Sequence, residues 1–248
     1  MFQCVEVALE ELRLLERLSE NQGCWLQCRT HSRWLLEVRL HGTLACKLIL
    51  TIGLSYVEPW GPYTTGAAPY LDVAIDWARQ TGLKIIIDLH GAPKSQNGFD
   101  HSGHTASWPA WGDSDSLSHT HAALKQIEQK YATLEMQDVV VAIQFLNEPF
   151  LLKLDQKMVK QFYHDAYYSL RGISDTPAML HDGFENPSWL NGFLTTQDND
   201  VRNVVVDHHE YQIFDSGLNA MSIDQHVALT CNSVRYSPAA TVPPGIDC

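Results

Sequence analysis

A carboxylate follows an apolar run in the segment VVVAIQFLNEPF, residues 139–150. Six of the first eight residues are Val, Ala, Ile or Phe, which is typical of a strand buried on both faces. Asn147 and Glu148 come at the end of this run, directly before a proline. Glu148 could act there as a general acid, because burial would raise its pKa, and Asn147 could bind a substrate hydroxyl. The alternatives are a helix N-cap or a buried salt bridge.

Polar residues also end three further predicted strands. His90 at such an end could simply cap a neighbouring carbonyl group. The adjacent histidines 208 and 209 could suggest a metal, but no third ligand is spaced to help them, so we predict no metal. An edge strand could bury Tyr211 and Phe214 in the core. The strand-end residues are Asp88 and His90, then His181 and Asp182, and finally His208, His209, Glu210 and Tyr211.

Segments with strand and helix character alternate from residue 47 onward. The predicted helices carry apolar residues at helical spacing, and the last of them has Ser222 as its N-cap. Five strands can be counted in this way. The predicted strands are 47–53, 83–91, the run from 139, 177–184 and 201–214, and the predicted helices are 68–82, 116–132, 155–172 and 222–232.

This alternation predicts an α/β fold with parallel strands and crossover helices, either a doubly wound sheet or a (β/α)8 TIM barrel. Polar residues at four consecutive strand tips are what the catalytic face of a barrel requires. A doubly wound nucleotide-binding sheet would have a glycine-rich turn after its first strand, and the sequence has none. The sequence therefore favours the barrel.

Composition narrows the function classes. The 248 residues are 45% hydrophobic and can form one large domain or two small ones. A formal net charge of −12 argues against nucleic acid and against anionic lipid surfaces, so a neutral ligand is favoured. We also expect no cofactor. No segment has the 18 or more apolar residues of a membrane helix, and residues 1–20 contain no apolar run typical of a signal peptide. Cys24 and Cys28 have a metal-like gap without a second pair, so no metal is expected there.

Three segments together resemble the fungal exo-β-1,3-glucanases of glycoside hydrolase family 5. They are IIIDLHGAPKSQNGFDHSG, AIQFLNEP and VVVDHHEYQIF, and the resemblance runs from about Ile52 to Asn232. It implies a monomeric, secreted or wall-bound retaining glycosidase that releases glucose from the non-reducing ends of β-1,3-glucan. Such enzymes use two carboxylates roughly 5 to 5.5 Å apart, one as acid/base and one as nucleophile.

The resemblance also implies roles for individual residues. Glu148 matches the acid/base, and Asn147 matches the neighbour that binds the 2-hydroxyl of the sugar. Phe99 and Phe214 resemble an aromatic pair at the cleft entrance. The substrate-binding residues implied in this way are His90, Asn147, His209, Tyr211, Asp100, Phe99 and Phe214.

The sequence departs from the family at several places. The family's nucleophile is a Glu in a Gly-Glu-Trp segment after the helix that 222–232 resembles, and no Glu follows Glu210 here. An arginine of the family's second strand is replaced by Ile49, and Lys94 replaces a small residue. We therefore expect the first, seventh and eighth barrel strands to be missing, the sheet edges to be open, and turnover to be negligible.

The predicted organisation is an atypical segment 1–46, a partial barrel 47–232 and a loop-like tail 233–248. Two accounts fit it: a fragment of an ordinary exo-glucanase, or a truncated relative that binds glucan without cleaving it. An endo-β-glucanase of the same family is a further alternative, although the SQNGFD segment resembles the one that closes an exo-enzyme's pocket. A metal-dependent hydrolase would lose its activity on chelation, and we expect no such loss.

Overall fold

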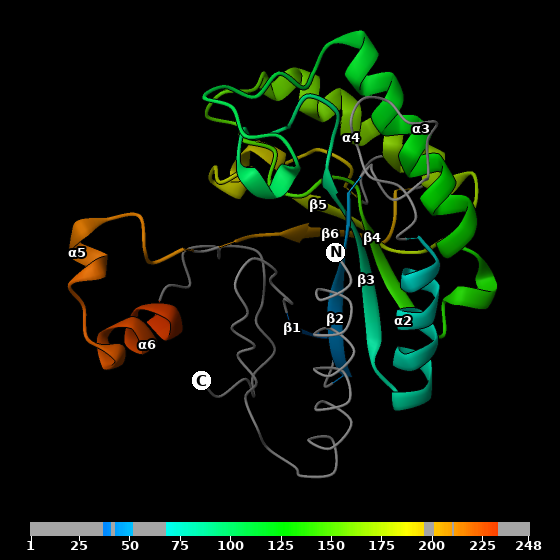
Figure 1. The fold of residues 1–248 in the computed structure, drawn as a ribbon, viewed down its shortest axis with the longest axis horizontal. Helices are drawn as coiled ribbons and strands as arrows, with labels where there is room; N and C mark the ends of the chain where they lie inside the picture. Colours follow the sequence, from blue (N-terminus) through cyan, green and yellow to red (C-terminus); the bar gives the residue numbers. More distant parts are fainter. Residues whose placement is uncertain (1–36, 41–42, 52–67, 196–200, 210, 233–248) are drawn as a thin grey trace.

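The computed structural model describes residues 37–40, 43–51, 68–195, 201–209 and 211–232. Within them six strands form one sheet in the order β1 to β6 (Figure 1). The first two pair antiparallel, and β2 to β6 are parallel throughout. The strands are β1 (Glu37–Leu40), β2 (Thr43–Thr51), β3 (Lys84–Gly91), β4 (Val140–Gln144), β5 (Ala178–His181) and β6 (Val204–Asp207).

Three long helices connect the parallel strands. They are α2 (Ala68–Thr81), α3 (Ser114–Tyr131) and α4 (Gln156–Arg171), and they lie together beside the sheet (Figure 1). Aspartate side chains start the last two, since Asp113 accepts a hydrogen bond from Ser116 N and Asp155 accepts one from Lys157 N. The predicted helices 68–82, 116–132 and 155–172 are thus confirmed within a few residues.

Alternate residues of the strands face opposite sides of the sheet. In β3, Ile85, Ile87 and Leu89 belong to the large core shared with the helices. Ile86 belongs instead to a small second cluster with Ala142 and Met179, against which Val205 packs. The sheet therefore has a helix-covered face and an inner face, and the inner-face residues at and just beyond the carboxyl ends of the strands form the site described below.

The structure corrects the predictions at both ends of the sheet. A strand, β1, lies within the segment 1–46 for which no strand was expected, and it pairs antiparallel with β2. The predicted strand 201–214 is wrong beyond Asp207, where pairing with β5 stops. Residues 1–36, the predicted strand end 52–53, Glu210 and the tail 233–248 lie outside the described residues.

Two further helices follow β6 and project from the body (Figure 1). They are α5 (Ser216–Asn219) and α6 (Ile223–Asn232), of which only the second was predicted. Ser222 and Gln225 bond reciprocally, because Gln225 N donates to Ser222 Oγ and Ser222 N donates to Gln225 Oε1. Short 3₁₀ helices span Asp100–Ser102, Leu134–Met136 and Pro187–Leu190. None of the described helices combines the length and the apolar character that spanning a bilayer requires.

Candidate active site

The site is built from the inner rows of the parallel strands. In β3 the row Ile86, Asp88, His90 alternates with the core residues, and cross-strand pairing sets Asp88 beside Gln144 of β4. On β5 and β6, His181 pairs with Asp207, and His209 lies two residues further on. Period-two alternation therefore brings polar side chains of β3 to β6 to one end of the sheet, the carboxyl end that parallel strands share.

Glu148 has three hydrogen-bonding partners on its carboxylate. Its side chain is buried, with 3% of the residue exposed. The Tyr211 hydroxyl donates to Oε1 at 2.7 Å, and His209 Nδ1 lies 2.5 Å from the same oxygen. His101 Nε2 lies 3.2 Å from Oε2, so both carboxylate oxygens are engaged.

The pKa of Glu148 is lowered from its ordinary value. Burial is the largest single influence and acts to raise this pKa, but the hydrogen bonds from His101, His209 and Tyr211, with the nearby charge of His209, together outweigh it. The expectation that the pKa of Glu148 would be raised overall is therefore wrong for this site. The reason is that the donors come from segments far from residue 148 in the sequence.

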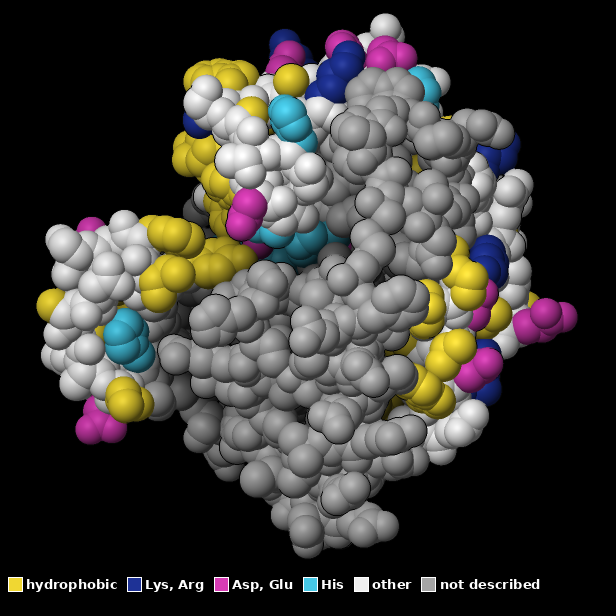
Figure 2. Space-filling model, in the orientation of Figure 1, with side chains coloured by type: hydrophobic (Ala, Val, Ile, Leu, Met, Phe, Trp, Pro, Cys, Tyr) yellow, Lys and Arg dark blue, Asp and Glu magenta, His cyan; other side chains and the backbone are white. Residues whose placement is uncertain are grey.

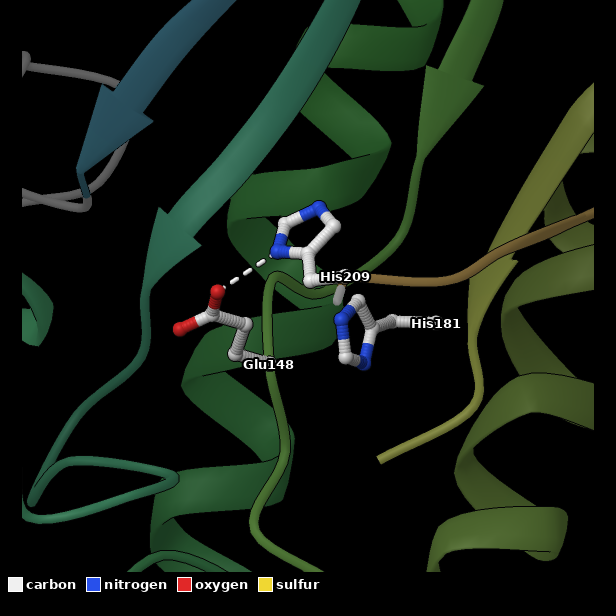
Figure 3. A group of neighbouring side chains, drawn as sticks. All are labelled: Glu148, His181 and His209. Carbon is white, nitrogen blue, oxygen red and sulfur yellow. Dashed lines mark hydrogen bonds and ion pairs between the residues drawn. The ribbon is translucent and has the colours of Figure 1, made fainter. Parts of the chain in front are cut away.

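His209 bridges two carboxylates. Its Nδ1 faces Glu148, as Figure 3 shows, and its Nε2 lies 3.0 Å from Asp207 Oδ2. Gln144 Nε2 donates to the same Asp207 oxygen at 2.9 Å, from β4 across β5 to β6. The His209 ring therefore lies between the carboxylates of Glu148 and Asp207. The chain from Gln144 through Asp207 and His209 thus supports an ionised Glu148.

The other aspartates of the strand ends also pair with histidines. His90 Nδ1 lies 2.8 Å from Asp88 Oδ2, and His208 Nδ1 lies 2.5 Å from Asp182 Oδ2. Asp88 and Asp182 are fully buried. Each strand-end aspartate of the described residues is therefore engaged by an imidazole rather than placed as a second, reacting carboxylate.

Glu148, His181 and His209 also have a geometry that could suit a metal ion. One ligand atom from each lies within 4.8 Å of the others (Figure 3). His208 does not belong to this group, so the group supplies no third ligand for the pair His208 and His209. His181 Nδ1, however, accepts a hydrogen bond from Gly183 N at 2.8 Å, which leaves the proton of the neutral ring on the other nitrogen. A nitrogen that binds a metal must be unprotonated. A metal held by this group would therefore have to break the hydrogen bond from Gly183 N to His181 and the one between His209 and Glu148.

The remaining predicted residues lie around this centre. Asn147 is buried, and its backbone N donates to Leu89 O at 3.0 Å, which joins the ends of β3 and β4. Asp100 is exposed and accepts a hydrogen bond from His101 N within its own turn. Phe99 and Phe214 are also exposed.

Aromatic rings connect Phe99 with Phe214. Phe99 lies 5.4 Å from Phe150 between ring centroids, and Phe150 lies 6.2 Å from Phe184. Phe184 is 6.1 Å from Tyr211, which is 5.5 Å from Phe214. Figure 2 shows histidine side chains at the lower margin of the upper part of the body, with hydrophobic side chains leading from them toward the projecting α5–α6 segment.

Sequence reasoning missed three members of the site: His101, Asp207 and Gln144. A signal for Asp207 was present, because Asp207 and His209 repeat the two-residue spacing of Asp88 and His90. Residues two apart on a strand face the same side, so this repeat indicates paired side chains. His101 lies in the 3₁₀ helix Asp100–Ser102, which is too short for periodicity to indicate the direction of a side chain.

Comparison with known proteins gives a consistent family. Residues 51–237 match the family model described as Cellulase (glycosyl hydrolase family 5). A glucan 1,3-beta-glucosidase of Yarrowia lipolytica is 39% identical over 180 residues, which are 72% of this chain and 42% of the relative. One from Blumeria graminis is 42% identical over 75% of this chain and 45% of the relative, and one from Pichia angusta is 34% identical over 93% and 55%. The chain thus spans about half the length of these curated relatives.

Solved structures share the fold at low sequence identity. A rutinosidase from Aspergillus niger aligns with a TM-score of 0.59 at 19% identity and covers 69% of this chain and 52% of the other. A structure described as AoRut aligns with a TM-score of 0.61 at 16% identity and covers 69% and 51%. With the family match, these likenesses identify the parallel strands and their helices as part of a (β/α)8 barrel.

Proposed function

The chain belongs to glycosyl hydrolase family 5, and on that basis we propose that its strand-end site is directed at β-1,3-glucan, with Glu148 as the acid/base carboxylate. The observation that carries this proposal is the convergence of His209, Tyr211 and His101 on the buried Glu148. A carboxyl group with fixed partners at a barrel strand end can exchange a proton with a glycosidic oxygen or with water. The same centre would hold a neutral sugar through hydrogen bonds from its neighbours.

The ionised Glu148 fits one half of the reaction. As a carboxylate it can accept a proton from water, which is the base step of a retaining mechanism. To act first as an acid it must hold a proton, and a second carboxylate close by would favour this by raising its pKa. The printed sequence has no Glu after residue 210, and the strand-end aspartates are engaged by histidines. We therefore propose that the printed chain binds glucan and turns it over negligibly.

The surroundings support a neutral glucan as ligand. The ring chain from Phe99 to Phe214 offers apolar faces on which sugar rings can stack, and Phe214 is 81% exposed. The net charge of −12 does not repel an uncharged polysaccharide. A monomeric protein of the cell exterior or wall, related to exo-acting enzymes, follows from the resemblance to the fungal exo-glucanases and belongs to the same proposal.

Binding is tested by calorimetric titration of the purified chain with laminari-oligosaccharides. We expect saturable binding, weakened about fivefold in Phe214→Ala because one aromatic contact of roughly 1 kcal/mol is lost. Leu134→Ala is the matched control, since Leu134 is also 81% exposed and lies in the 3₁₀ helix after α3. No binding by the folded chain would refute the glucan assignment.

Turnover is tested by glucose release from the same oligosaccharides. We expect none above background from the printed chain or from Glu148→Gln, with Glu135→Gln as an exposed control. If the unmodified chain and Glu135→Gln release glucose but Glu148→Gln does not, Glu148 keeps its acid/base role. The proposal of negligible turnover would then be refuted. Release of longer products instead of glucose would favour the endo-acting alternative. A full-length transcript that encodes a downstream Gly-Glu-Trp segment would identify the source of the second carboxylate.

A further inference from the structure

The backbone at Glu148 adopts a conformation that its local sequence disfavours. Its φ is +47°, in the left-handed region that residues with a side chain avoid. Pro149 follows it, and a residue before proline prefers extended backbone. Glu148 is therefore held in place by contacts from elsewhere in the chain.

Two adjacent residues of the loop after β3 supply such contacts. Gln96 Nε2 donates to the carbonyl oxygen of Asn147 at 2.8 Å, and Asn97 Nδ2 donates to that of Glu148 at 3.2 Å. In return, Phe150 N donates to the carbonyl oxygen of Gln96 at 3.1 Å. Contacts to Gln96 and Asn97 thus fix the backbone on both sides of the Glu148 side chain.

The two amide side chains are themselves fixed. Gln96 Nε2 also donates to His90 O at 2.8 Å, and Gln96 Oε1 accepts a hydrogen bond from Ala92 N at 3.0 Å. Asn97 Oδ1 accepts from Phe99 N at 2.8 Å. Gln96 is fully buried and Asn97 nearly so, so water does not compete for these bonds.

We propose that Gln96 and Asn97 are positioning residues that hold Glu148 in its left-handed conformation and so direct its carboxylate at His209 and Tyr211. That this position serves catalysis rests on the proposed function, whereas the conformation itself does not. The SQN part of the loop motif acts on the backbone of the Asn-Glu-Pro segment, about 51 residues away in the sequence. The SQN and Asn-Glu-Pro segments are therefore joined by direct hydrogen bonds.

The test compares two substitutions at Asn97. Asn97→Asp keeps the acceptor for Phe99 N but loses the donor to Glu148, whereas Asn97→Ala loses both. The measurement is the NMR signal of the His209 ring, which reports its bond to Glu148. We expect both variants to shift this signal away from wild type, in the direction seen in Glu148→Ala. Asn186→Asp is the control, because its Oδ1 only accepts a bond from Ser188 N in a 3₁₀ helix.

A residue that only supports its own loop would give another pattern. Asn97→Asp would then keep the wild-type His209 signal while Asn97→Ala shifted it, and the proposal would be overturned. The signal does not depend on glucan. If wild type bound no glucan but both variants still shifted the signal, the proposed function would fail and the positioning role would stand.

A second measurement is available if the Asn97 variants do not fold. Glycine normally lowers stability relative to alanine, but at a left-handed φ the order reverses. We expect Glu148→Gly to unfold at a higher urea concentration than Glu148→Ala. The opposite order would show that the backbone is not held in this conformation, and it would overturn the proposal.

Discussion

Of the three hydrogen-bonding partners of Glu148, Tyr211 is the one whose effect on the carboxylate can be isolated most cleanly by substitution. Its hydroxyl donates to Oε1 at 2.7 Å, and Tyr211→Phe removes this donor without changing the ring. Because the bond favours the ionised carboxylate, we expect the pKa of Glu148 to rise in this variant. A carbon-13 NMR titration of labelled glutamate measures the change, with the exposed Tyr70→Phe as control. An unchanged titration would contradict the assignment of this donor.

Another buried carboxylate, that of Glu128, lies away from the site, between α3 and α4. Burial raises the pKa of Glu128 from 4.5 to about 7, and a bond from Ser169 Oγ at 2.7 Å only partly opposes this. The folded pKa is above the unfolded one, so the contribution of Glu128 to stability is fully present below pH 4.5 and is lost as the pH rises through about 7. The shift corresponds to about 3 kcal/mol.

We therefore expect Glu128→Gln to lose this decline in stability with pH. Above pH 7 the variant should unfold at a higher urea concentration than wild type, and near pH 4.5 the two should agree. Urea unfolding at several pH values measures the difference. Glu135→Gln, at an exposed glutamate, should follow wild type at every pH.

Individual side chains were predictable from sequence where a motif marked them. The strand-end position of Glu148, His209 and Tyr211 was visible, and these three are in contact in the structure. The protonation of Glu148 was not visible, because it depends on donors that only folding brings together. His101 illustrates this, since its loop comes 47 residues before Glu148 in the sequence.

At the scale of elements, the loop after β3 depends on glycine at a close approach. Gly98 has a φ of +79°, and an added Cβ would lie 2.5 Å from Ala106 O, whose residue bonds back to Gly98 O. Gly98→Ala should therefore destabilise the fold by about 2 kcal/mol or more. Gly192 has a similar φ of +70° but nothing within 4 Å of such a Cβ.

Gly192→Ala is thus the matched control for Gly98→Ala. This substitution should lower the free energy of unfolding by about 1 kcal/mol, because alanine at this position has only the left-handed backbone to disfavour it. Chemical denaturation of both variants measures the two costs. Equal losses would show that the contact with Ala106 has no energetic effect and that the loop moves aside.

The helices were predicted well because their apolar spacing reflects packing on a single core. The strand after residue 201 was predicted too long, since the apolar and aromatic residues up to Phe214 resemble a strand continuing past Asp207. Tyr211 instead points its hydroxyl at Glu148, and Asp215 starts α5 by accepting bonds from Gly217 N and Leu218 N. The contacts that Tyr211 and Asp215 make in the folded protein thus override the strand propensity of this segment.

At the scale of the whole molecule, the described sheet has an interior and two ends. β3, β4 and β5 lie between other strands, and most of their side chains are almost fully buried. β6 is the last strand of the described sheet, and Val206 is 44% exposed. The barrel class was predictable from the strand-end residues, but the antiparallel pairing of β1 with β2 was not, because the pattern of a four-residue strand is too short to detect.

This arrangement predicts a gradient of local stability. Amides of β4 should exchange with deuterium about tenfold more slowly, or slower still, than those of β6, because opening an edge strand breaks fewer bonds and exposes less apolar surface. Hydrogen exchange followed by mass spectrometry of peptides covering 140–144 and 204–207 measures the ratio. Equal protection of the two strands would mean that another segment, of this chain or of a partner, pairs with β6 in solution. The exposed Val206 would then lie at an interface. The segment that pairs with β6 would also be a strand that could carry the second carboxylate for Glu148.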